Sequence, residues 1–205
     1  MDGVVIDSNG HHRKAWVAFN ASHGIATTEA MLGGMYGKRN DEIVREFFGA
    51  HLTADEALAH GAAKESLFRD MIAHDVNALL VPGIREFLQR HQHTAIALAT
   101  NAEAANASFV LERTGLLPLF RFVVDGHQVT HAKPHPEIYL RAAELLGVAP
   151  AECVVFEDSY AGVAAGLAAG MPVIGITTTH HDLPGTVLTA PNFQDPSINA
   201  YLQAH

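Results

Sequence analysis

Six polar residues of this chain have the side chains that proton transfer, anion binding and metal binding require. Each lies at or just beyond a short apolar run or turn, where a parallel sheet would present its carboxyl edge. Open α/β folds bind ligands at that edge. We therefore expect the six to meet in one site, although they are spread over most of the sequence. They are Asp2, Thr100, Asn101, Lys133, Glu157 and Asp158.

The adjacent acids Glu157 and Asp158 indicate a metal site. They follow an apolar run, Cys-Val-Val-Phe, which predicts a buried strand. Two carboxylates so close repel each other unless one is protonated or a cation binds them. Mg²⁺ takes oxygen ligands of this kind. The alternative, an exposed acidic turn, fits poorly with the apolar run that precedes it.

The other four residues suit an anionic substrate. Thr100 and Asn101 end a short apolar strand, where a hydroxyl and the N–H groups of a helix N-terminus can hold a phosphate oxygen, although both are also common N-cap residues. Lys133 can neutralise phosphate charge, although a lone lysine is usually a solvated surface charge. Asp2 can exchange protons with a leaving group and with water, or be an ordinary turn residue beside Gly3.

The order of these motifs resembles that of the haloacid dehalogenase superfamily of phosphohydrolases, in the branch that contains β-phosphoglucomutase and small sugar-phosphate phosphatases. That family opens on Asp-x-Asp-Gly-Val-x-x-Asp-Ser/Thr. This chain matches from the x onward, with Met1 at x, Asp2 at the second Asp, and Asp7 and Ser8 at the end. The first Asp, the family's nucleophile, would precede Met1. We expect the natural chain to carry a further apolar strand that ends in this Asp.

The resemblance favours the catalytic interpretation of Asp2, Thr100, Asn101 and Lys133, the last within the matching context Lys-Pro-His-Pro-Glu-Ile-Tyr. It implies that Asp2 protonates the leaving group and later activates water. The Asp before Met1 would form an aspartyl-phosphate.

For the metal, the resemblance implies Mg²⁺ bound directly by Asp158. Glu157 would bind it directly or through water. Asp2 would contribute its backbone carbonyl, and the Asp before Met1 would complete the protein ligands.

Three further residues are candidates for substrate binding. His12 stands where family members often carry a histidine near the substrate, although its neighbour His11 could equally be the one that faces inward. Lys38 and Arg39 could grip a phosphate or sugar from a cap loop, or form an exposed charge pair. The key cap arginine of β-phosphoglucomutase-like enzymes aligns with Asn40, which favours a phosphatase over a mutase.

Strand and helix patterns alternate through the second part of the chain, which predicts an α/β fold with a doubly wound parallel sheet. We expect this Rossmann-like core to span residues 1–9 and 79–205. Residues 10–78 show only helical patterns and predict an inserted cap domain of the four-helix type, with Trp16 in its core. Thr53 and Glu56 have the spacing of a capping box at the start of one of these helices.

Composition excludes several classes of protein. The chain has 205 residues, of which 48% are hydrophobic and 17% charged, typical of one globular unit rather than a disordered chain. The net charge of −9, without a basic run, argues against nucleic acid or an anionic membrane as partner. The single cysteine, Cys153, excludes an internal disulfide and fits a reducing compartment. We expect a cytoplasmic monomer or weak homodimer.

These observations predict a Mg²⁺-dependent phosphatase of small phosphorylated metabolites, with sugar phosphates as the expected substrates. One alternative is a sugar phosphomutase on the same scaffold. The other is a non-catalytic protein that binds a phosphorylated ligand, because the nucleophile is not among these 205 residues.

Overall fold

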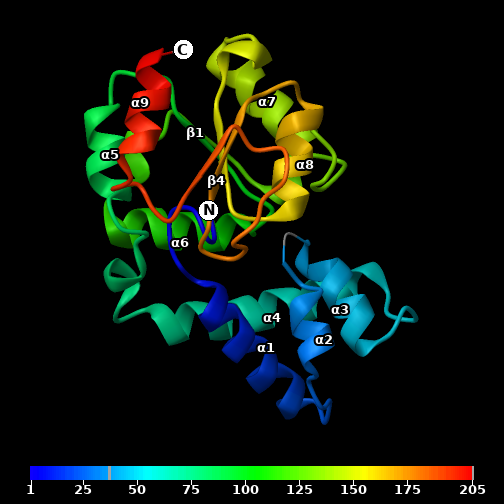
Figure 1. Cartoon of the computed structure of the whole chain (residues 1–205). Helices are drawn as coiled ribbons and strands as arrows, with labels where there is room; N and C mark the ends of the chain where they lie inside the picture. The colour runs from blue at the N-terminus through cyan, green and yellow to red at the C-terminus, as the bar shows by residue number, and fades with distance from the viewer. Residues whose placement is uncertain (37, 205) are drawn as a thin grey trace.

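The computed structural model describes residues 1–36 and 38–204 and has the predicted α/β class, with a helical part beside a layered α/β part (Figure 1). All strand pairings among the described residues are parallel, in two sheets of order β1-β2 and β3-β4-β5. The strands are β1 (Ala97–Ala99), β2 (Phe122–Val124), β3 (Val155–Glu157), β4 (Val173–Ile176) and β5 (Leu188–Ala190).

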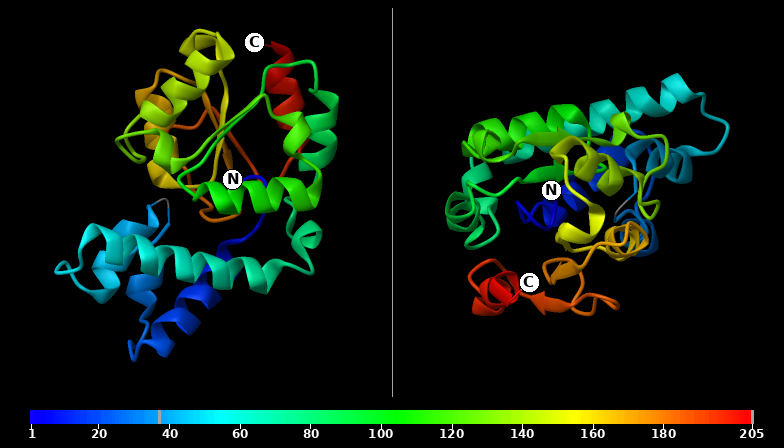
Figure 2. Two further views of the ribbon diagram at one scale, coloured as in Figure 1. Left: turned by 180° about the vertical axis from the view of Figure 1, so that it is seen from behind. Right: turned by 90° about the horizontal axis from the view of Figure 1, so that it is seen from above.

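Helices cover both faces of the strands (Figure 2). Alternation along β4 shows why: Val173 packs in one buried cluster with α7 and α8, whereas Ile174 and Ile176 pack in another with α5, α6 and α9. The helices of this part are α5 (Ile84–Arg90), α6 (Ala104–Thr114), α7 (Glu137–Leu146), α8 (Tyr160–Ala168) and α9 (Pro196–Ala204), with short 3₁₀ turns η1 (Val76–Leu79), η2 (Leu117–Leu119), η3 (Gly126–Gln128) and η4 (Pro150–Glu152).

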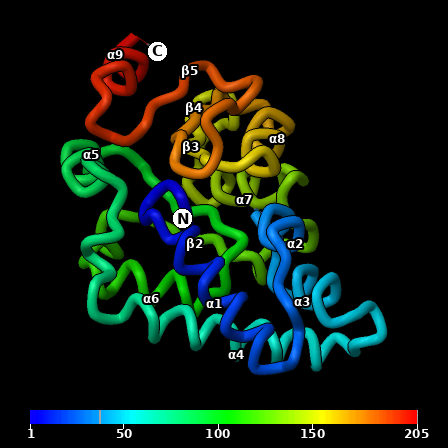
Figure 3. The backbone as a smooth tube through the Cα atoms, turned by 60° about the horizontal axis from the view of Figure 1, so that its bottom comes forward, coloured from blue at the N-terminus to red at the C-terminus, as the bar shows by residue number. Residues whose placement is uncertain are grey.

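The helical part follows the first residues of the chain (Figure 3). Trp16 is almost fully buried at its centre, as predicted, in a cluster separate from the two that flank the strands. The predicted capping box is present: Glu56 N–H donates to Thr53 Oγ1 (3.2 Å) and Thr53 N–H donates to Glu56 Oε2 (2.9 Å). The domain limits at residues 10 and 78 stay a prediction. The four helices are α1 (Asn9–Ser22), α2 (Glu29–Gly33), α3 (Asn40–Phe48) and α4 (Ala54–Ile72).

The first residues form a tight loop, as expected for a segment that follows a strand. The amides of Val4, Val5 and Ile6 all donate to the Met1 carbonyl, so the chain turns at once instead of extending. Gly3 has a φ of 69°, and a Cβ at this position would lie 1.9 Å from Asp158 Oδ2. Glycine is therefore required both by the backbone conformation and by the close approach of the acidic site.

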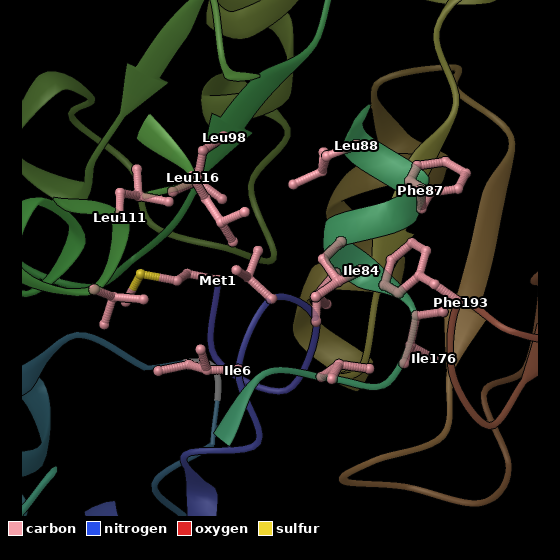
Figure 4. Close-up of a cluster of buried hydrophobic side chains, with 14 of the residues drawn as sticks. Met1, Ile6, Ile84, Phe87, Leu88, Leu98, Leu111, Leu116, Ile176 and Phe193 are labelled. Carbon is pink, nitrogen blue, oxygen red and sulfur yellow. The ribbon is translucent and has the colours of Figure 1, made fainter. Parts of the chain in front are cut away.

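A large apolar cavity separates the two sheets. It has a volume of about 750 Å³ and is lined by residues 94–99 around β1, residues 153–157 around β3, and Met1, Val4 and Val5. Among the described residues, no strand pairs with the edges of β1 and β3 that face it. Figure 4 shows Met1 in the adjoining hydrophobic cluster, with Leu98 and Ile84. The cavity therefore lies where a parallel strand between β1 and β3 would run, and its apolar lining suits the side chains of such a strand.

Burial also affects the chain's α-amino group. Desolvation lowers the pKa of the Met1 amine, which lies among charged groups of the site. Among residues 1–36 and 38–204, no helix is long and apolar enough to cross a membrane.

We predict that fusing an apolar strand of about six residues directly ahead of Met1 stabilises the fold. Full burial of even one large apolar side chain contributes ~1.5–3 kcal/mol, so the free energy of unfolding should rise by at least ~2 kcal/mol. Denaturant unfolding measures this change. A Gly/Ser extension of equal length is the control, and equal stability of the two fusions would show that the cavity does not accept a strand.

Candidate active site

The predicted residues meet at one cavity between the helical part and the carboxyl ends of the strands. Thr100 directly follows β1, and Glu157 is the last residue of β3. The cavity has a volume of about 120 Å³. Of the predicted site residues, those that line it are Asp2, His12, Lys38, Thr100, Asn101, Lys133, Glu157 and Asp158. The strand ends explain this convergence, because parallel strands present successive loops at the same edge.

Glu157 is the most extensively hydrogen-bonded of the acids. Its Oε1 accepts from Lys133 Nζ and from Tyr139 OH (2.6 Å), and its Oε2 accepts from the amides of Asp158 (3.0 Å) and Ser159 (3.2 Å) and from the Ser159 hydroxyl (3.0 Å). Burial alone would raise its pKa, but the Lys133 charge and hydrogen bond lower the pKa of Glu157 to about 2. Glu157 is therefore an ionised anchor with both oxygens in use.

Asp158 has the opposite electrostatic character. Burial and the neighbouring Glu157 carboxylate raise the pKa of Asp158 to about 7, despite a hydrogen bond from the Thr179 hydroxyl. The negative charge of Asp158 is therefore not fully neutralised by the cations of the protein around it. A carboxylate in this condition favours a bound cation, since opposite charge nearby stabilises its ionised form.

Asp2 is held by the first turn of α1. Its Oδ1 accepts from the Ser8 hydroxyl (2.5 Å) and lies 3.3 Å from His12 Nε2. Burial opposes ionisation, but the bonds and charge of His12, together with the Ser8 bond, hold the pKa of Asp2 well below its usual range. Of the two adjacent histidines left open by the sequence, His12 is thus the one that faces the site. Its ring also stacks on Phe68 at 3.7 Å between centroids.

Two charged residues of α4 were not predicted as site residues. Lys64 and Glu65 are 1% and 3% exposed and pair at 2.7 Å between Nζ and Oε1. Lys64 Nζ also lies 2.9 Å from His12 Nδ1, and Glu65 accepts from Asn40 (2.7 Å) and from Asn106 (2.5 Å). The sequence around them, Ala-Ala-Lys-Glu-Ser, carries no signal that distinguishes this buried pair from an exposed one.

The cap-loop cations differ in their placement. Lys38 lines the cavity and its Nζ pairs with Glu46 Oε1 at 2.6 Å. Arg39 instead points to the α/β part, where its Nη2 donates to the Val129 carbonyl (2.8 Å) and its Nη1 to the Thr130 carbonyl (3.5 Å). The structure therefore gives Arg39 a bridging contact between the two parts of the fold and leaves Lys38 at the cavity wall.

The loop after β4 adds a contact that the sequence did not indicate. Besides its bond to Asp158, Thr179 Oγ1 accepts from Asn9 at the start of α1. Thr178 Oγ1 donates to the Gly3 carbonyl (2.5 Å). His180 stacks on Tyr160 with 4.1 Å between ring centroids. These hydroxyls fix the first loop of the chain against the acidic residues.

Comparison with known proteins agrees with this geometry. A family model of haloacid dehalogenase-like hydrolases matches residues 1–170. The chain is 32% identical over 185 residues to validoxylamine A 7′-phosphate phosphatase of Streptomyces hygroscopicus subsp. limoneus, covering 88% of this chain and 84% of that one. It is 30% identical over 177 residues to a fructose-1-phosphate phosphatase of Escherichia coli (strain K12), covering 86% and 93%.

Solved structures show the same relationship. The crystal structure of a β-phosphoglucomutase from Clostridium difficile superimposes with a TM-score of 0.85 at 25% identity, covering 98% of this chain and 96% of that one. The chain therefore belongs to the haloacid dehalogenase-like hydrolases. Within them it is a phosphoric monoester hydrolase of the β-phosphoglucomutase-like branch, as its motif order predicted.

The acidic residues differ in their capacity to hold a divalent cation. Asp158 offers hard oxygen atoms in an environment that disfavours an unbalanced charge. Both oxygens of Glu157 already accept hydrogen bonds, which suits contact with a metal through water more than direct ligation. The donor chemistry therefore fits Mg²⁺ with Asp158 as the main protein ligand.

We predict that Asp158→Asn makes the metal-free protein more stable than the unchanged chain at pH 8. Because the folded pKa of Asp158, about 7, exceeds the unfolded value of 3.8, its contribution to stability is present below pH 4 and is lost as the pH rises to about 7. Removing the charge should therefore raise the free energy of unfolding at pH 8 by ~1–3 kcal/mol.

Denaturant unfolding at pH 5 and pH 8 in a chelator measures this effect, and the difference should narrow at pH 5. The same substitution should abolish the stabilisation that added Mg²⁺ gives the unchanged chain. An Asn variant that is less stable at pH 8, or one that retains the Mg²⁺ effect, would contradict the electrostatic assignment.

Proposed function

We propose that the chain catalyses Mg²⁺-dependent hydrolysis of small phosphorylated sugars and related metabolites. The observation that carries this proposal is the convergence of Lys133, Thr100 and Asp158 on one cavity beside the acid–base candidate Asp2. Hydrolysis of a phosphate monoester needs neutralisation of the phosphoryl oxygens and proton transfer at the leaving oxygen, and these residues offer both. Relatives whose names specify fructose 1-phosphate and validoxylamine A 7′-phosphate as substrates support the substrate class.

In this proposal Thr100, Asn101 and Lys133 bind the transferring phosphoryl group. Thr100 Oγ1 accepts from the Ala102 amide (3.1 Å), which leaves its hydroxyl hydrogen for a phosphate oxygen. Lys133 Nζ is held by Glu157 and by the Ala99 carbonyl (3.4 Å), so its charge is fixed at the cavity with a side-chain exposure of only 6%. A fixed cation in a water-poor site stabilises developing negative charge more than a mobile one does.

Asp2 is the proposed general acid and base. In the described arrangement the contacts with Ser8 and His12 keep Asp2 ionised but weakly basic, so removal of a proton from water becomes easier when these contacts loosen. Protonation of a leaving oxygen requires Asp2 to release these partners first. His12 is itself bonded to Lys64 of α4, so movement of the helical part would change the environment of Asp2 directly.

Asp158 is the proposed direct ligand of Mg²⁺, with Glu157 acting through water and Asp2 through its backbone carbonyl. When bound, the ion supplies positive charge that neutralises the phosphoryl oxygens. The nucleophile implied by the family pattern is the Asp directly before Met1, which would give an aspartyl-phosphate.

A chain extended by an apolar strand that ends in Asp directly before Met1 is predicted to hydrolyse a generic phosphate ester at least ~10³-fold faster than the same extension ending in Asn. The reason is that only the carboxylate forms the covalent intermediate, whereas acid–base catalysis alone supplies ~10²–10⁴-fold. Steady-state turnover per folded protein, with Mg²⁺ present, measures the difference. Equal turnover of the Asp and Asn extensions would rule out this nucleophile.

A sugar phosphomutase is the second candidate, supported by the similarity to β-phosphoglucomutases in sequence and structure. Asn40, at the position of the expected cap arginine, is engaged by Glu65 (2.7 Å) and Glu103 (3.1 Å) and offers no cation to a second phosphate. Product analysis with a hexose 1-phosphate and a hexose bisphosphate primer separates the two functions. Inorganic phosphate is the product of a phosphatase and hexose 6-phosphate the product of a mutase.

We predict that Lys38→Ala raises the KM for a sugar phosphate by at least ~10-fold and changes the KM for a small aryl phosphate by less than ~2-fold. Lys38 lies at the cavity wall on the helical side, where it can reach the sugar but not a small ester, and a charged hydrogen bond contributes ~1.5 kcal/mol or more. Glu46→Gln, which removes the partner of Lys38 but not the cation, is the matched control. Equal changes in KM for both substrates would remove Lys38 from the specificity determinants.

A further inference from the structure

A second cluster of potential metal ligands lies outside the acidic site, on the loop between η3 and α7 and at the first residue of α7. His131, His135 and Glu137 bring three ligand atoms within 4.8 Å of one another. His131 Nδ1 lies 2.9 Å and His135 Nδ1 3.8 Å from the same oxygen, Glu137 Oε2. The two imidazole rings are 4.5 Å apart at an angle of 34°. The three ligands come from seven consecutive residues.

The carboxylate of this cluster is held in place by the backbone. Glu137 Oε1 accepts from the Thr130 amide (2.7 Å) and Oε2 from the His131 amide (2.9 Å). These bonds lower the pKa of Glu137 to about 2, so the carboxylate is ionised at neutral pH. Hydrogen bonds from the protein that orient a carboxylate ligand are typical of metal sites.

The histidines face solvent and each other. His131 and His135 have side-chain exposures of 61% and 49%, so a hydrated ion can reach them without opening the fold. Lys133 lies between them in sequence, but its side chain is buried at Glu157 and does not compete with a cation for this surface.

We propose that His131, His135 and Glu137 form a transition-metal site, distinct from the acidic Mg²⁺ site, that binds Zn²⁺ or a related imidazole-preferring ion. Two imidazoles and one carboxylate, with water in the fourth position, are a donor set that suits Zn²⁺ and not Mg²⁺, which requires oxygen ligands. His131 and Glu137 would bind the ion in place of their hydrogen bond (2.9 Å), and His135, whose Nδ1 accepts from the Glu137 amide (3.2 Å), would supply the third ligand atom.

The position of the cluster gives metal binding a consequence for the rest of the molecule. Arg39 of the helical part donates to the carbonyls of Val129 and Thr130, directly before His131. Lys133 of the active site lies between the two histidines. An ion that joins His131 to His135 therefore fixes the loop that carries Lys133 and that accepts the hydrogen bonds of Arg39 from the helical part.

The test is titration of the whole chain with Zn²⁺ by calorimetry, and with Co²⁺ by its visible absorption, in excess Mg²⁺. We expect one ion per chain at this site. His131→Ala/His135→Ala should weaken binding by more than ~10-fold, since loss of even an outer-shell partner typically costs 10–100-fold. His127→Ala, which removes an exposed histidine of η3 outside the cluster, is the matched control and should bind as the unchanged chain does.

A third variant, Asp158→Asn, separates the two metal sites. It should retain Co²⁺ absorption, and Mg²⁺ should not displace Co²⁺ from the loop. Absence of binding to the unchanged chain would overturn the proposal, as would equal binding by the His131→Ala/His135→Ala variant. Loss of the Co²⁺ signal in Asp158→Asn would also overturn it, by placing the ion in the acidic site.

Discussion

The ion pair between Lys133 and Glu157 is the interaction on which the active site depends. Both side chains are less than 10% exposed, so neither charge is tolerable without the other. Glu157 then accepts from the amides of Asp158 and Ser159 at the start of α8, and a Cβ at Gly162 would lie 2.0 Å from its carboxyl carbon. The small residue in the first turn of α8 thus has a specific role: it admits the carboxylate that fixes Lys133.

A second polar network connects the helical part to the strands. Glu65 of α4 binds Asn106 of α6, and its neighbour Lys64 contacts His12, which in turn contacts Asp2. A buried network of this kind is costly to break in part, because each group left without a partner pays its full desolvation cost. The relative position of the two parts and the protonation of Asp2 are therefore linked through the same side chains.

The strands form two separate sheets, yet the residues of the active site still lie together at their carboxyl ends. The residues after each strand still meet at the carboxyl edge, because α7 contacts β1 and β2 and also packs against α8, which lies on β3 and β4. The apolar cavity lies beneath this edge. Helix packing thus holds the two sheets in a fixed relative position and preserves the geometry of the site. The loop of residues 1–7 lies at the same edge of the strands, with Gly3 against Asp158.

Motif order and hydrophobic periodicity in the sequence determined the family, the α/β class, the helical segment and eight of the residues that line the cavity. These properties are local, because each residue is placed by its own element: Thr100 and Asp158 directly follow a strand, and Lys133 lies shortly before a helix. Tertiary structure decided what depends on neighbours distant in sequence. It placed His12, and not His11, against Asp2. It also directed Arg39 to the Val129 carbonyl and buried Lys64 beside Glu65. It also decided the path of the first residues, which form a tight loop because the amides of Val4, Val5 and Ile6 all donate to the Met1 carbonyl.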